Sequence, residues 1–219
     1  NNSPLVSSGS MVIGSTIRMS PVSRPSSRNM METPERAGPW AIRHAIGGTN
    51  MNIRTERPDD YEAVYSLVEQ AFASAEHSDG TEQDLVAALR KGEAFVPELS
   101  LVAEIDGKIV GHILFTEAKV GGDTVLVLAP LSVLPAYQRR GVGTALIQEG
   151  HQIARRLGYA YSLVLGSETY YPRCGYLPAE SFGIEIPEGM PPANFLAIRL
   201  REDAKPVHGA VIYAKEFGI

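Results

Sequence analysis

The chain has one cysteine and no long apolar run, and each shortage excludes a class of protein. Because Cys174 is alone among 219 residues, an internal disulfide and a thiolate metal cluster are both excluded. A reducing cytoplasm suits this composition. No stretch stays apolar for the length that a membrane span requires. We therefore expect a cytoplasmic protein with no metal centre and no membrane partner.

Basic residues are also in short supply, since 20 lysines and arginines stand against 25 acidic residues, a formal net charge of -5. Residues 1–50 hold five arginines and two glutamates, a charge of +3, so residues 51–219 carry -8. A nucleic-acid-binding domain presents a basic face. Nucleic acid is therefore not expected as a partner, although a local basic patch can still bind one anionic ligand.

Residues 1–50 lack a sustained hydrophobic period and are rich in Ser, Pro, Gly, Met and Arg. A segment of this composition buries too little apolar surface to order itself. We predict a disordered or non-native extension here, with an organelle transit peptide as the alternative. The folded domain is expected to span residues 51–219, with Met51 as a plausible natural start.

The body of the chain mixes helix and strand signals. Apolar residues recur at helical spacing after residue 58, after residue 81 and over residues 142–157, where Val142, Leu146, Gly150, Ile153 and Leu157 share one face. Two apolar runs meet at Asp106 and Gly107, a dipeptide that accepts positive φ and so predicts a β-hairpin.

Residues 125–133, "VLVLAPLSV", are apolar at nearly every position, which is typical of a strand buried on both faces. Pro130 cannot donate to a ladder, so it predicts a bulge or a splayed edge at that point. "YSLVLG" after the third helix is a further strand, and a right-handed crossover would make the two strands parallel. "FLAIRL" and "GAVIYA" predict two closing strands that pair within the chain or between chains.

Residues 131–150, "LSVLPAYQRRGVGTALIQEG", run from that strand over two glycines into a helix. The opening amides of a helix have no intrahelical partner and its dipole favours negative charge, so this turn predicts a phosphate site. A P-loop is excluded because Gly-Lys-Ser/Thr is missing. A dinucleotide fingerprint remains a distant alternative, since Leu146 occupies its third small position and too few residues follow Glu168 for a doubly wound sheet.

Two motifs carry a resemblance to a known family. "QRRGVG" resembles the acyl-CoA pyrophosphate loop of the GCN5-related N-acetyltransferase (GNAT) superfamily, and "YYPRCGY" resembles its later motif, with Tyr171, Gly175 and Tyr176 on the matching positions. The resemblance implies a mixed α/β fold, in which a mostly antiparallel central sheet with a splayed parallel strand pair is flanked by helices.

The same resemblance implies an N-acetyltransferase that uses acetyl-CoA as cosubstrate. A primary amine of a small molecule or peptide attacks the thioester directly in a ternary complex. The alternative is a non-catalytic module that binds or senses acyl-CoA. A homodimer is a further expectation for the assembly.

The resemblance also assigns residues to roles. Tyr171 is expected to protonate the leaving thiolate. The expected cofactor-binding residues are Leu131, Ser132, Val133, Gln138, Arg139, Arg140, Gly141, Val142, Gly143 and Thr144. Cys174 is expected to be a small buried side chain and not a nucleophile, because nothing nearby in the sequence activates it.

The general base and the acceptor site are less defined. Many relatives place a glutamate where Ala129 and Pro130 stand here, so Glu117 is the candidate base. Glu104, His112, Glu168 and a water chain are the alternatives, with His112 interpreted first as a structural histidine. Glu76, Asp79, Glu82 and Asp84 cluster between the first two helices, where they either attract a cationic amine or form a solvated acidic face.

Overall fold

The computed structural model describes residues 42–46, 49–73 and 80–218. Nine strands form one sheet in the order β1-β2-β3-β4-β5-β6-β8-β7, with β9 beside β4. The strands are β1 (Ile42–Ile46), β2 (Thr49–Thr55), β3 (Phe95–Ile105), β4 (Lys108–Val120), β5 (Asp123–Val133), β6 (Tyr161–Leu165), β7 (Leu177–Pro178), β8 (Phe195–Arg199) and β9 (Val211–Ile212). The helices are α1 (Tyr61–Phe72), α2 (Glu82–Leu89) and α3 (Val142–Arg156), and short 3₁₀ turns fill several connections.

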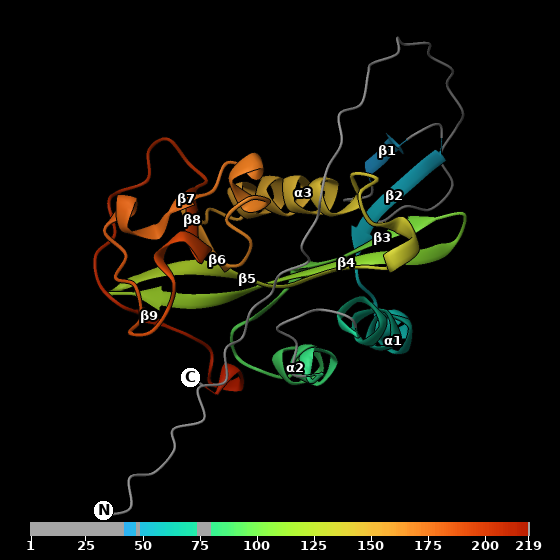
Figure 1. Ribbon diagram of the computed structural model, residues 1–219, viewed down its shortest axis with the longest axis horizontal. Coiled ribbons are helices and arrows are strands. Elements are labelled where there is room, and N and C mark those ends of the chain that lie inside the picture. Colours follow the sequence, from blue (N-terminus) through green and yellow to red (C-terminus); the bar gives the residue numbers. More distant parts are fainter. Residues whose placement is uncertain (1–41, 47–48, 74–79, 219) are drawn as a thin grey trace, which may run out of the picture.

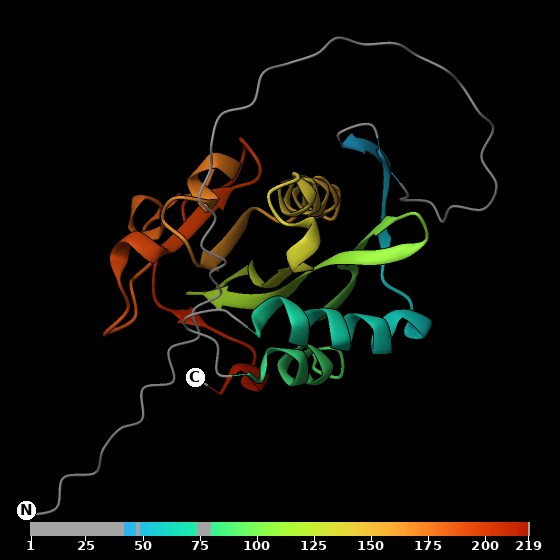
Figure 2. The same ribbon diagram turned by 45° about the vertical axis from the view of Figure 1, so that its right-hand side comes forward.

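The helices cover both faces of the sheet. Helices α1 and α2 lie against one face and α3 against the other, as Figure 1 and Figure 2 show. Each helix buries the apolar stripe that its sequence period predicts, so two separate hydrophobic clusters sandwich the sheet. On α3 the predicted face is buried from Val142 to Ile153, whereas Leu157 lies at the helix end and is 45% exposed.

The expected mixed and mostly antiparallel sheet is confirmed. The named strands pair antiparallel except β5 with β6, the pair joined by the α3 crossover. This parallel pairing is limited to Leu126 with Ser162 and Val127 with Leu163. Beyond Val127 the end of β5 leaves β6, so the two strands splay apart toward the α3 start.

The irregularity predicted at Pro130 is a β-bulge. Leu131 pairs with Ile113 of β4 and Leu128 pairs with Phe115, so Ala129 and Pro130 together lie opposite Leu114 alone. A bulge of this kind suits proline because the extra residue needs no ladder hydrogen bond.

The tight β3–β4 turn is confirmed, with Asp106 at φ 51° and Gly107 at φ 76°. Strand β9, from the predicted "GAVIYA" segment, pairs with β4 of the same chain. The sheet begins at Ile42, ahead of the domain start expected at Met51, because β1 pairs with β2. Residues 1–41 of the predicted extension lie outside the described residues. Within the described ranges, no helix combines the length and the apolar character that crossing a membrane demands.

Candidate functional site

The connection between β5 and α3 holds the two glycines that the sequence singled out. After a 3₁₀ turn at Pro135–Tyr137, Arg139 has φ 60° and Gly141, the N-cap of α3, has φ 87°. The amide of Ala145 donates to the Gly141 carbonyl at 3.0 Å, which is the first bond of the helix. The amides ahead of Ala145 therefore have no intrahelical acceptor, and the helix dipole adds positive potential around them.

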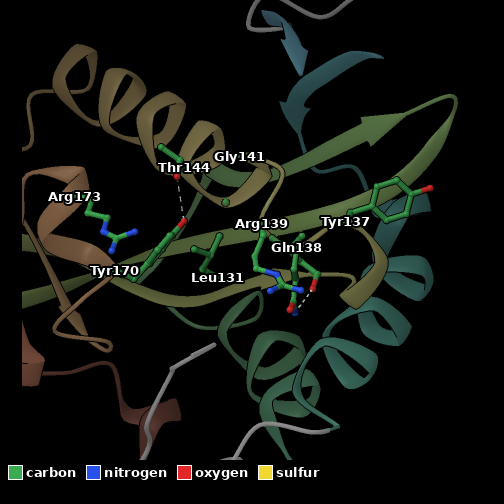
Figure 3. Close-up of a pocket in the computed structure, with 10 residues that line it drawn as sticks. Leu131, Tyr137, Gln138, Arg139, Gly141, Thr144, Tyr170 and Arg173 are labelled. Carbon is green, nitrogen blue, oxygen red and sulfur yellow. Dashed lines mark hydrogen bonds between the residues drawn. The ribbon is translucent and has the colours of Figure 1, made fainter. Parts of the chain in front are cut away.

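A pocket of about 190 Å³ opens at this helix start (Figure 3). Its lining consists of Leu131, Val133, Tyr137, Gln138, Arg139, Gly141, Gly143, Thr144, Tyr170 and Arg173. All but Tyr137, Tyr170 and Arg173 belong to the predicted cofactor set. Residues of strand β5, the following loop and helix α3 thus line one cavity.

Three predicted cofactor residues lie outside this lining. Ser132 and Val142 are each 1% exposed, because their side chains point into the two hydrophobic layers. Arg140 is exposed, and its guanidinium lies 5.7 Å from the ring centroid of Tyr137. Side chains alternate along a strand, so Ser132 points away from the pocket that its neighbours line.

Tyr170 and Arg173 reach the pocket from the segment after β6, and sequence reasoning missed both. The Tyr170 hydroxyl lies 3.4 Å from Thr144 Oγ1 on the first turn of α3 (Figure 3). Burial raises the pKa of Tyr170 to about 12, so the phenol stays protonated at neutral pH. The aromatic and basic neighbours of Tyr171 within "YYPRCGY" were the available signal for these two residues.

The end of β5 turns a free backbone edge toward the splay. The Leu134 amide donates to the Val110 carbonyl at 2.9 Å, and bonded pairs recur at every second residue of an antiparallel ladder. By that alternation the backbone amide and carbonyl of Ser132 point toward β4, whereas the backbone amides of Leu131 and Val133 point to the other side, toward β6. Gln138 Nε2 donates to the Val133 carbonyl at 3.1 Å, which agrees with this direction.

Tyr171 is buried beside the pocket and does not line it. It is 3% exposed and packs edge-on against Tyr170 and Tyr176, with ring centroids 5.2 and 5.7 Å away. Its hydroxyl makes no hydrogen bond to the residues that the structure describes. Burial first, and then the neighbouring phenols and Cys174, raise the pKa of Tyr171 well above its ordinary value. The side chain is thus a protonated donor without a partner.

The candidate bases lie apart from the pocket. Glu117 is opposite Leu126, five residues before Leu131 and so roughly 16 Å along β5. Its carboxylate accepts a hydrogen bond of 2.5 Å from Tyr159. Glu104 pairs with Arg54 at 2.6 Å, and Glu168 accepts from Asn194 at 2.8 Å. None of these three carboxylates is among the residues that line the pocket.

The acidic cluster is only partly described. Glu76 and Asp79 lie outside the described residues. Asp84 accepts a 2.7 Å hydrogen bond from Tyr65, and Glu82 is 9% exposed at the start of α2. These two carboxylates thus belong to the α1–α2 layer.

A splayed parallel pair, with a glycine loop and a helix start at its open end, defines the N-acyltransferase class of fold. The sequence profile of the Acetyltransferase (GNAT) family matches residues 61–176. The uncharacterized N-acetyltransferase YhbS of Escherichia coli K12 is 31% identical over 171 residues, which cover 76% of this chain and 98% of that protein. The chain belongs to the GNAT acetyltransferase family.

Other comparisons agree with this assignment. The uncharacterized N-acetyltransferase YjhQ of the same strain is 48% identical over 101 residues, and this match spans 44% of the chain and 56% of YjhQ. The crystal structure of a GNAT acetyltransferase from Brucella melitensis in complex with acetyl-CoA is 34% identical, with a TM-score of 0.64, over 76% of this chain and 97% of that one. The YhbS structure in complex with CoA is 28% identical with a TM-score of 0.71, over 80% and 96% of the two chains.

Proposed function

We propose that the protein is an acetyl-CoA-dependent N-acetyltransferase that moves an acetyl group to a primary amine by direct attack in a ternary complex. One observation carries the proposal: a pocket with bare helix-start amides lies directly beside an open strand edge. The homologous structures with acetyl-CoA and CoA support the same cosubstrate here. A cytoplasmic location and a homodimer stay predictions.

The loop supplies the grip on the diphosphate. In this proposal the amides of residues 139–144 donate to the diphosphate oxygens, and glycine at 141 and 143 lets the backbone approach closely. Arg139 lines the pocket and adds a charge-assisted hydrogen bond to phosphate. Arg173 brings a second guanidinium from the other wall (Figure 3).

The open edge of β5 aims the thioester. The pantetheine amides pair with this edge like an added strand. The Leu131 or Val133 amide then polarises the thioester carbonyl, in the manner of an oxyanion hole. The Leu131 and Val133 amides both point into the space between the splayed strands β5 and β6, because successive backbone amides of a strand point to opposite sides.

Tyr171 protonates the departing thiolate in this scheme. Its position in the "YYPRCGY" motif supports that role, and its hydroxyl carries a proton at neutral pH. General acid catalysis is worth about 10²-fold or more. Tyr170 is assigned a different task, the shaping of the pocket wall against Thr144.

The test is incubation of the protein with acetyl-CoA and a panel of small amines and peptides while free thiol is followed. Tyr171→Phe is expected to lower kcat about 10²-fold with little change in CoA affinity. Tyr170→Phe, the matched control on the adjacent ring, is expected to change CoA affinity more than kcat. Equal kcat for Tyr171→Phe and the wild type would remove Tyr171 from the scheme.

A second function, a non-catalytic acyl-CoA-binding or sensing module, has one observation in its favour. Ala129 and Pro130 stand where many members of the family carry a glutamate, and the Glu117 carboxylate accepts a hydrogen bond from Tyr159. Binding of acetyl-CoA without thiol release for any amine, protein lysines included, would support this module. Turnover with any acceptor eliminates it.

A further inference from the structure

A buried polar cluster lies on the α1–α2 face of the sheet, behind the open strand edge. It joins Glu56, just after β2, to Arg90 at the end of α2, Ser100 of β3 and His112 of β4. Arg90 donates to both carboxylate oxygens of Glu56, through Nε at 3.1 Å and through NH2. Ser100 Oγ donates to Glu56 Oε2 at 2.7 Å. Glu56 therefore accepts hydrogen bonds from three donor atoms.

These bonds fix the tautomer of His112. Ser100 Oγ and His112 Nε2 are 3.2 Å apart. The hydroxyl has a single proton, which it gives to Glu56, so its lone pair must accept from Nε2–H. The Nε2 atom also lies 3.7 Å from Glu56 Oε1, on the same side. With the proton on Nε2, the Nδ1 atom carries a bare lone pair.

The bare lone pair has no partner. His112 is fully buried and Nδ1 makes no hydrogen bond to any described residue. Buried polar atoms without a protein partner are rare in native proteins, so each one calls for an explanation. The expected structural role of His112 therefore accounts for Nε2 and leaves Nδ1 unexplained.

Ser132 faces His112 across the ladder. The two residues are direct partners in the β4–β5 register, so their side chains share one face with Cβ atoms about 5 Å apart. Ser132 Oγ is also buried and unpartnered. Two buried polar atoms without a protein partner thus belong to facing residues of β4 and β5, and one water can bridge them.

We propose that Ser132 and His112 form a proton relay for the acceptor amine, replacing the glutamate that this site lacks. The idea rests on the proposed acetyl transfer. As the amine nitrogen bonds to the acetyl carbon, its proton passes over a water to Ser132 Oγ. The Ser132 hydroxyl proton moves to His112 Nδ1, and Glu56 offsets the charge through Ser100. The C–S bond then breaks, and the thiolate takes its proton from Tyr171.

Burial, more than the neighbouring charges, keeps the His112 ring neutral. Burial lowers the pKa of His112 to about 4; Glu56 raises it and Arg90 lowers it. The ring is therefore unprotonated at neutral pH, with Nδ1 available. Ser132 is buried and points away from the pocket, so its hydroxyl takes the proton over a water, and His112 is a positioning residue that acts through Ser132.

Thr116 provides a matched control for the activity test. It is another buried, unpartnered hydroxyl of β4, but it lies opposite Val127, on the far side of the bulge. We expect Ser132→Ala and His112→Gln to lower kcat at least tenfold, with KM for acetyl-CoA and the melting temperature within the range of Thr116→Val. The deficit should shrink as pH rises, because other bases then take the proton. A Ser132→Ala variant with the kcat of Thr116→Val overturns the relay.

An activity-independent measurement separates the two proposals. In protein labelled with ¹⁵N-histidine, His112 is expected to show a protonated Nε2 and an unprotonated Nδ1 at neutral pH. The opposite tautomer overturns the relay, whatever the turnover. If no amine is acetylated, the proposed function fails and the relay with it. If acetylation occurs but Ser132→Ala has the kcat of the Thr116→Val control, the proposed relay is wrong and the proposed function stands.

Discussion

Gly143 offers a sharp test of the pocket because the structure fixes what a methyl group would meet. A Cβ at this position would lie 2.7 Å from the Tyr170 hydroxyl and 3.4 Å from Leu131 Cδ2. Carbon and oxygen atoms approach to about 3.3 Å at closest, so the hydroxyl must move by about 0.6 Å. The hydroxyl is the far end of a side chain, so the Tyr170 ring can shift, and its hydroxyl then loses the contact with Thr144 Oγ1.

The substitution Gly143→Ala is expected to change the free energy of CoA binding more than the free energy of unfolding. Gly143→Ala gains about 1 kcal/mol in helix propensity and loses about 1–3 kcal/mol by overpacking. The net loss of at most about 2 kcal/mol leaves most of a typical stability intact. Losing one charge-assisted hydrogen bond to the diphosphate removes about 1.5–3 kcal/mol of binding, which weakens the Kd for CoA roughly 10- to 100-fold.

The assay is calorimetric titration with CoA beside a melting curve. Gly122→Ala is the control, because it adds the same methyl in the β4–β5 turn with no atom within 4 Å. An unchanged Kd in Gly143→Ala, with the control behaving as expected, would show that the diphosphate does not sit against this helix start.

Three further predictions concern packing, charge and pH. In Gly150→Ala the new Cβ would lie 2.4 Å from buried Phe115, so unfolding free energy should fall by about 1–2 kcal/mol, and adding Phe115→Leu should restore part of it in a double-mutant cycle. Arg139→Ala should weaken CoA binding about tenfold at low salt and less at high salt, in titrations at two ionic strengths. Burial lowers the pKa of His112 and His151 from 6.5 to about 4, so the unfolded chain takes up protons before the folded protein does as the pH falls. Melting curves should therefore show that stability is lost between about pH 6.5 and 4, by at most roughly 3 kcal/mol per histidine. A flat pH profile of the melting temperature would contradict this prediction.

Local patterns predicted most of the fold because they are decided by neighbours in sequence. The Asp106–Gly107 turn, the helical stripes and the irregular Pro130 each follow from backbone preferences that tertiary contacts did not override. The Gly141 loop was found for the same reason, since positive φ and a helix start are local properties.

The missed parts depend on contacts between distant segments. Tyr170 and Arg173 enter the pocket only because the segment after β6 returns to the α3 start, and no local pattern measures that distance. The cluster around His112 joins four separate elements. Sequence alone gave a histidine on a buried strand, for which a structural role is the common meaning; the tautomer follows only from the partners that folding supplies.

The bulge at Ala129 and Pro130 decides which side of the site each residue of β5 serves. Before the bulge Leu126 and Leu128 face α3 and Val127 faces α1. Strict alternation would then send Leu131 toward α1 and Ser132 toward the pocket. One extra residue reverses that order, so Leu131 lines the pocket and Ser132 meets His112. A β5 without the bulge would therefore put a hydroxyl against the diphosphate pocket and a leucine against His112, which leaves the amine's proton without a polar route through the sheet.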